Sequence, residues 1–215
     1  MYICLTLLSY LKAVNMGSKE RILRQKEETR NNILKAARQI VKEEGWQGLS
    51  MRKIADKIEY TAPIIYEYFA NKEAILQELT KKGFLKLAKE LEDAKKQFET
   101  PEGQLEAMWM AFWNFGLNNK EMYQLMYGVQ MMCCNQSTPE TDAPYDLICP
   151  PIAQLMNEPD PDSETVVQKY FTFFSVIHGL ISLNMLSSGL PDDMNKQILK
   201  DAISGMIRYI KLNEP

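Results

Sequence analysis

Apolar residues along most of the chain recur at steps of three and four positions, which is the period of an amphipathic α-helix. Between residues 26 and 44, for example, Ile33, Ala36, Ile40 and Val41 are separated by polar and charged residues. Further segments with this period are residues 71–98, 102–117, 121–132, 163–188 and 192–212. Sustained alternation of apolar and polar residues, the mark of a strand, is missing from the sequence. The pattern therefore predicts an all-α protein.

Start and stop signals divide the first third of the chain into short helices. Gly45 follows the first helix and suits a left-handed C-terminal cap. Ser50 is a good N-cap for a second helix, and Thr61 is expected to cap a third one, with Pro63 in its first turn. Asn71 is expected to cap a long fourth helix. The signals thus predict two short helices, separated by three residues, between two longer ones.

Residues 135–161 interrupt the helical pattern because they contain six of the ten prolines. Proline has no backbone N–H and breaks a helix interior. We therefore expect loops in this segment, around one short helix near residues 152–156. Ser163 is expected to cap the long helix that follows.

The charge is unevenly distributed along the chain. Residues 16–72 carry 12 basic and 8 acidic residues, whereas residues 73–215 carry 12 basic and 20 acidic ones. A basic N-terminal region next to an acidic remainder suggests that only the N-terminal region binds a polyanion. Scatter by chance is the alternative reading of the charges alone. The hydrophobic share of 46% and the charged share of 25% are those of an ordinary globular protein.

The composition also excludes several classes of function. His178 is the only histidine, so a site with several histidines is excluded, and the four cysteines form no CxxC pair. Cys133 and Cys134 are expected to be buried or in a loop. We find no base–nucleophile pair, phosphate loop or metal constellation, so no catalytic residue, metal, cofactor or enzymatic activity is expected. Few cysteines and no apolar run of about 18–20 residues favour a cytoplasmic protein without a membrane span.

Residues 1–18 form an N-terminal extension of uncertain role. Residues 1–14 are apolar but lack the basic start and the cleavage site of a signal peptide. Met16 opens a charged stretch and is a candidate natural start. A short docking helix is the alternative.

Residues 50–72 have the pattern of a helix-turn-helix motif, in which two short helices are joined by a tight turn. The first helix has an inward face with Ile54 and Ala55. The second has few core positions, which leaves Thr61, Ala62 and Pro63 free to reach base edges in a major groove.

From about residue 26 to residue 79 the sequence resembles the DNA-binding domain of the tetracycline-repressor (TetR) family of bacterial transcription regulators. The matching segments are residues 33–37, 45–46, 49–55 and 65–75. The most specific of them is the aromatic run that precedes Asn71-Lys72-Glu73. The resemblance implies a three-helix DNA-binding domain, residues 19–71, joined to a larger helical domain for ligand binding and dimerisation, residues 72–215.

The resemblance also implies which side chains contact double-stranded operator DNA. The head of the recognition helix would face bases, while hydroxyl and cationic groups around it would bind phosphates. The implied contacts are Ser50, Arg52, Lys53, Thr61, Ala62, Pro63, Tyr66 and Lys72. The alternatives are that Tyr66 is a core aromatic and that Arg52 and Lys72 are solvated charges. Glu59 departs from the glycine that the family often has in the turn, where a left-handed residue is needed.

The body is expected to dimerise and to sense a small molecule. Paired half-sites need a two-fold protein, so helices 163–188 and 192–212 of two subunits would form a four-helix bundle. The alternative is that these helices complete the core of a monomer. The candidate pocket has apolar and aromatic walls suited to an apolar or aromatic effector. Its residues are Trp109, Phe112, Trp113, Tyr123, Tyr127, Met131 and His178, for each of which plain core packing is the alternative.

The sequence thus predicts a homodimeric transcriptional regulator, a repressor that a small-molecule effector releases from its operator. A ligand acts in this way only if it prefers the conformation that cannot bind DNA. The alternative is a helical small-molecule-binding protein with a vestigial DNA-binding head.

Overall fold

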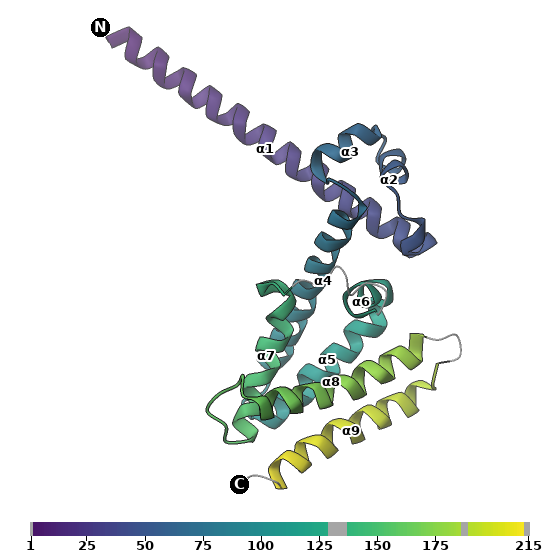
Figure 1. Cartoon of the computed structure of the whole chain (residues 1–215). Helices are drawn as coiled ribbons and strands as arrows, with labels where there is room; N and C mark the ends of the chain where they lie inside the picture. The colour runs from purple at the N-terminus through teal and green to yellow at the C-terminus, as the bar shows by residue number, and fades with distance from the viewer. Residues whose placement is uncertain (1, 129–136, 186–188, 213–215) are drawn as a thin grey trace. The chain divides into compact units, whose positions relative to one another are not determined.

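The computed structural model describes the backbone of residues 2–128, 137–185 and 189–212, and the side chains of these ranges from residue 18 onward. Within these ranges the chain forms α-helices and one short 3-10 helix, with no strand (Figure 1). The predicted all-α class is therefore confirmed. The helices divide into two compact units, Met1–Ile75 and Leu76–Pro215.

The first unit is a small helical domain built on α1 (Tyr2–Glu44). It continues with η1 (Trp46–Gly48), α2 (Met51–Lys57) and α3 (Ala62–Tyr68). Helix α1 begins well before the expected start near residue 26. Buried apolar residues form the core of the unit. They come from α1, α2, α3 and the segments next to these helices. They include Ile33, Ala37, Ile40, Leu49, Ile54, Ala55, Ile65 and Phe69.

The local signals of the first unit take the expected conformations, with one exception. Gly45 ends α1 with a φ of 73°. The Ser50 side chain accepts a hydrogen bond from the Lys53 N–H at 3.2 Å, and Asn71 Oδ1 accepts one from the Ala74 N–H at 2.8 Å. Thr61 occupies the N-cap position of α3, but its side chain makes no capping hydrogen bond. The short helices are thus defined mainly by local backbone chemistry.

The turn between α2 and α3 has a left-handed residue where the sequence offers no glycine. Glu59 has a φ of 59°, and the Tyr60 N–H donates to the Ala55 carbonyl at 2.9 Å. This bond reaches back five residues, as in a Schellman C-cap, and the residue before its donor is normally glycine. Glu59 therefore adopts a conformation that a side chain disfavours.

The second unit surrounds a central helix. Helix α4 (Lys72–Lys95) leads into it, followed by α5 (Pro101–Asn118), α6 (Lys120–Tyr127), α7 (Pro139–Leu155), α8 (Glu164–Met185) and α9 (Asp192–Leu212). Helix α5 packs against α6, α7, α8 and α9. Its buried residues are Leu105, Met108, Trp109, Phe112, Trp113, Phe115 and Gly116. This central position places the aromatic side chains of α5 in the interior of the unit.

The prediction of loops is wrong for residues 139–151, because α7 occupies Pro139–Leu155, whereas residues 157–161 lie outside helices as predicted. Thr138 forms a capping box at its start, and Pro139 stands in the first turn, where its missing N–H is harmless. Pro144, Pro150 and Pro151 lie inside the helix. Each costs about 3 kcal/mol in a helix interior. The offsetting term is burial against α5 and α8, at about 1.5–3 kcal/mol per large apolar side chain. The buried residues of α7 are Pro144, Ile148, Cys149, Pro151, Ile152, Ala153 and Leu155.

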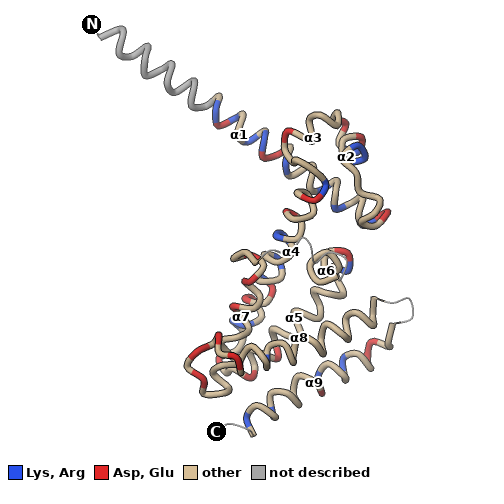
Figure 2. Tube along the Cα trace, in the orientation of Figure 1, with Lys and Arg blue, Asp and Glu red and all other residues tan. Residues whose placement is uncertain are grey.

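Helix α8 is, among the described helices, the one long and apolar enough to cross a membrane by length and composition. It packs against α5, α7 and α9. Core helices of soluble proteins meet the same criterion, and 33% of the apolar window of α8 is buried in the single chain. Several residues of the turn that joins α7 to α8 are acidic, as the red segments of the tube in Figure 2 show. They include Glu158, Asp160 and Asp162.

Candidate DNA-binding and ligand-binding sites

Helices α2 and α3 form the predicted helix-turn-helix pair. They pack against each other, and Ile54 of α2 and Ile65 of α3 are fully buried. The opposite sides of both helices remain open, so that Arg52, Thr61 and Pro63 are exposed. The pair thus presents the N-terminal end of α3 to solvent, as a recognition helix requires.

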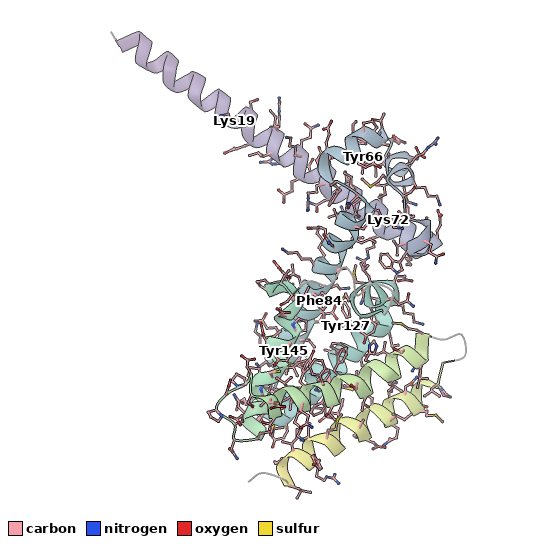
Figure 3. The ribbon with its side chains drawn as sticks, in the orientation of Figure 1. Lys19, Tyr66, Lys72, Phe84, Tyr127 and Tyr145 are labelled. Atoms are coloured by element: carbon pink, nitrogen blue, oxygen red, sulfur yellow. The ribbon has the colours of Figure 1, made fainter. Side chains whose placement is uncertain are left out.

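Tyr66 lies on the outer side of α3 with 54% of its surface exposed (Figure 3). It is therefore not a core aromatic, which was the alternative reading of this residue. Ala62, at the start of α3, is half-buried. Tyr60 is a further exposed aromatic at 42%, in the turn directly before α3. Sequence reasoning did not single out Tyr60, although an aromatic residue between two short helices was a signal for a surface role.

Two of the predicted contact residues are engaged locally. Ser50 caps α2, and the Lys53 ammonium forms an ion pair with Glu44 at the end of α1. A second pair joins Lys57 to Glu43 at 2.9 Å, and this hydrogen bond is the main reason why the pKa of Glu43 lies below its ordinary value. Exposed pairs of this kind contribute little free energy. Lys53 can therefore leave its ion pair with Glu44 for a phosphate group at a small cost in free energy.

Lys72 stands at the first position of α4, with its side chain directed to the end of α1 rather than to solvent alone. Its Nζ donates a hydrogen bond to the Trp46 carbonyl at 2.9 Å, and the side chain is half-buried. An ammonium has three protons, so this bond leaves two for other acceptors. The solvated-charge alternative is incomplete, because Lys72 also ties the start of α4 to η1.

The second unit contains a cluster of aromatic side chains from α4, α5, α6 and α8. Trp109, Phe112, Trp113 and Tyr123 are buried, whereas Tyr127 and His178 are half-buried. Phe84 of α4 meets Tyr127 edge to face at 5.4 Å between ring centroids (Figure 3). Met131, the remaining predicted pocket residue, lies outside the described residues, as do Cys133 and Cys134. Ring contacts therefore join five of the seven predicted residues, Trp109, Phe112, Tyr123, Tyr127 and His178, whereas Trp113 is a buried residue of α5.

Tyr123 and His178 form the polar contact of this cluster. The Tyr123 hydroxyl and His178 Nδ1 are 2.7 Å apart, and the rings are nearly parallel at 5.7 Å. The direction of the hydrogen bond depends on the tautomer of the histidine. Whichever nitrogen carries the proton, His178 Nε2 has the complementary role, donor or acceptor. The pair thus links α6 to α8 through a hydrogen bond between two groups that are neutral near pH 7.

Phe174 connects the parts of the cluster but was missed as a candidate. Its ring stacks on His178 at 5.3 Å and on Tyr170 at 6.1 Å, and it meets Phe112 edge to face at 6.0 Å. Phe174 is half-buried. Its position one helical turn before His178 was the available signal, because residues four apart share a helix face.

The electrostatics of the cluster favour uncharged groups. Burial raises the pKa of Tyr123 and of Tyr127 well above the ordinary value. Burial also lowers the pKa of His178 below its usual 6.5. The phenols and the imidazole are therefore neutral near pH 7. Within the described residues, no group of three or more His, Cys, Asp and Glu side chains is placed to hold a metal ion.

The first unit defines a class of protein, an all-helical chain with an N-terminal helix-turn-helix motif whose recognition helix is exposed. Residues 33–79 match the family described as bacterial regulatory proteins, tetR family. The resemblance to the TetR family seen in the sequence is thus confirmed over this segment. An uncharacterized HTH-type transcriptional regulator of Haemophilus influenzae is 28% identical over 127 residues. This match spans 54% of the present chain and 64% of the relative, a little less than two thirds.

Solved structures share the fold over most of the chain. A protein of unknown function from Rhodococcus sp. RHA1 superposes with a TM-score of 0.69 at 22% identity, covering 84% of this chain and 94% of that one. A TetR variant from Acinetobacter baumannii AYE, in complex with minocycline, gives a TM-score of 0.62 at 16% identity, with coverages of 85% and 96%. At these identities the likeness concerns the fold alone.

Proposed function

We propose that the protein is a cytoplasmic, homodimeric transcriptional regulator that represses genes by binding operator DNA. The observation that carries this proposal is the exposed N-terminal end of α3 within a segment that matches the TetR family. In the proposed complex α3 lies in the major groove, where Thr61, Ala62 and Pro63 face base edges. The remaining predicted contacts hold phosphates: Ser50, Arg52, Lys53, Tyr66 and Lys72.

The proposed dimer uses α8 and α9, which would pair with the same helices of a second copy. Both helices carry large apolar side chains that stay exposed in the single chain. They are Phe171, Val176 and Leu183 on α8, and Met194, Ile198 and Tyr209 on α9. A four-helix bundle would cover such side chains, and a two-fold dimer provides the two recognition helices that paired half-sites need. A monomer core does not account for their exposure.

The proposed control is release of DNA by a small molecule bound in the aromatic cluster of the second unit. The cluster has neutral, mostly apolar walls, which favour an apolar or aromatic effector. The structurally similar A. baumannii protein is in complex with minocycline, so this fold can hold a polycyclic molecule. By linkage, the effector must bind the conformation that has lost DNA affinity more tightly than the conformation that binds DNA.

DNA binding is tested by selecting duplexes from a random pool and measuring their affinity by fluorescence anisotropy over a range of salt concentrations. Tyr66→Phe and Lys72→Ala should weaken binding to all duplexes. The magnitude of the salt slope should fall for Lys72→Ala by about 1 per phosphate contact, hence by about 2 for a dimer. Lys96→Ala removes the same charge outside the helix-turn-helix and should change neither quantity.

Failure of the selection to enrich any sequence over random DNA would contradict the proposal. The protein would then be the helical small-molecule-binding protein with a vestigial head. An unchanged affinity for Tyr66→Phe and Lys72→Ala would remove these two residues from the contacts while leaving the function standing.

A further inference from the structure

The indole N–H of Trp109 is buried without a hydrogen-bond partner. Trp109 of α5 has no exposed surface. Among the described residues, its Nε1 is the one buried side-chain nitrogen or oxygen that finds no acceptor. Buried polar groups in folded proteins nearly always have a partner, so an exception indicates that something else supplies the acceptor. Since Trp109 lies in the candidate ligand site, a ligand is the candidate for that acceptor.

The surroundings of Trp109 belong to the same aromatic cluster as the Tyr123–His178 pair. The indole stacks on Phe173 at 5.5 Å and 13°, and it contacts Tyr170 at 5.9 Å and Phe112 at 5.5 Å. Tyr170 and Phe112 both contact Phe174, whose ring stacks on His178. A continuous path of rings therefore leads from the fully buried Trp109 to the half-buried Phe174 and His178. A flat molecule that replaced part of these ring contacts would meet aromatic faces.

Within the described residues, the rings that contact Trp109 and Phe174 carry no charge that could balance that of an ionic ligand. The aromatic contacts of Trp109 and Phe174 are with neutral side chains. Burying an ion without a partner is strongly unfavourable, whereas a neutral oxygen that accepts a hydrogen bond satisfies both itself and the indole. The chemistry thus selects neutral acceptors, such as the oxygen of a ketone or an ether.

We propose that the effector is a neutral aromatic molecule with a hydrogen-bond acceptor, and that Trp109 Nε1 donates to this acceptor. This assignment rests on the effector-controlled function proposed above. It makes Trp109 a specificity residue, because an aromatic hydrocarbon of the same shape would leave the indole N–H unpaired.

Three small probes test the proposal with the full-length protein. Acetophenone has an aromatic ring and a neutral acceptor, ethylbenzene has the same ring without an acceptor, and benzoate carries a charge. Titration calorimetry should show acetophenone binding about three- to tenfold more tightly than ethylbenzene, the range expected from one hydrogen bond. Benzoate should bind more weakly than either. The indole ¹H–¹⁵N signal of Trp109 should move downfield only with acetophenone.

The N–H itself is tested by placing benzothienylalanine at position 109, which keeps the shape of the indole and replaces the N–H by sulfur. This protein should bind both neutral probes equally, and Trp109→Phe should do the same. Trp46→Phe, the same substitution in the first unit and outside the candidate ligand site, should keep the preference for acetophenone. The benzothienylalanine protein preserves the core volume, so the test does not depend on how well Trp109→Phe folds.

Three results would overturn the proposal. They are no saturable binding of acetophenone up to its solubility limit, a preference for acetophenone that survives loss of the N–H, and a Trp109 signal already shifted downfield without a probe. The last result would mean that a water molecule or another part of the chain supplies the acceptor. DNA binding of the same proteins is measured in parallel. Selective DNA binding without the probe preference would refute this inference alone, whereas loss of selective DNA binding would refute the proposed function.

Discussion

Tyr66 in the first unit and Phe112 in the second are both aromatic side chains of candidate sites, and they differ in burial. Tyr66 is 54% exposed, whereas Phe112 has no exposed surface. The same contrast holds for their neighbours, since Arg52 and Thr61 are exposed, while Trp109 and Tyr123 are buried. In the first unit, the exposed candidate contact residues are thus a different set from the core residues. In the second unit one set of side chains both forms the core and lines the candidate ligand site.

The largest expected effect of this difference is on stability. Phe112→Ala should lower the free energy of unfolding of the second unit by about 3–5 kcal/mol, because it leaves a cavity among packed rings. Tyr66→Ala, a matched loss of an aromatic ring, should change the stability of the first unit by less than about 1 kcal/mol. Urea unfolding followed by far-ultraviolet circular dichroism measures both. Equal losses for the two variants would contradict the contrast between the units.

The contrast also determines how much of each site the sequence could predict. The helix-turn-helix depends on local signals, such as the left-handed Gly45 and the caps at Ser50 and Asn71, which are visible in the sequence and were confirmed. The body depends on packing between distant segments. Pro150 and Pro151 predicted a loop by local rules, but burial against α5 and α8 keeps them in a helix.

The candidate ligand site shows the same limit. Spacing along α5 and α6 predicted that aromatic residues share a face, but it could not distinguish core from pocket. The contact between Tyr123 and His178, which joins residues 55 positions apart, needed the fold. Phe174 was missed because α8 is rich in aromatic residues on several faces. The unpaired N–H of Trp109 is a property of its surroundings and has no signature in the sequence.

A smaller effect is expected at Glu59, the residue of the first unit whose backbone conformation conflicts with its side chain. With φ at 59°, Glu59→Gly should raise the stability of this unit by about 1 kcal/mol, because glycine adopts left-handed angles without strain. Thermal unfolding measures the change. Glu59→Ala is the matched control, which removes the charge but keeps the Cβ, and it should leave stability nearly unchanged.

Both Glu59 variants remove a negative charge beside the proposed DNA surface and should therefore tighten DNA binding equally. An equal gain in stability from the alanine variant would show that the carboxylate, rather than the backbone angle, is the unfavourable feature. The charge of Glu59, and not the backbone geometry of the turn, would then limit the stability of the first unit.

The smallest expected effect concerns the half-buried His178 and tests whether the polar contact of the second unit is part of its core. Burial lowers the pKa of His178 in the folded protein, so the unfolded chain binds a proton more readily. Stability should therefore be full above the ordinary pKa of 6.5 and should fall as the pH drops below it. We expect a loss of less than about 1 kcal/mol, because solvent screens a partly exposed ring.

His178→Gln is the control variant. Its side chain can still hydrogen-bond Tyr123 but does not titrate, so the stability of this variant should not change with pH near 6.5. Urea unfolding at several pH values measures the free energy of unfolding of both proteins. If it depended on pH in the same way for both, burial would not lower the pKa of His178. The contact between Tyr123 and His178 would then belong to the surface rather than to the core.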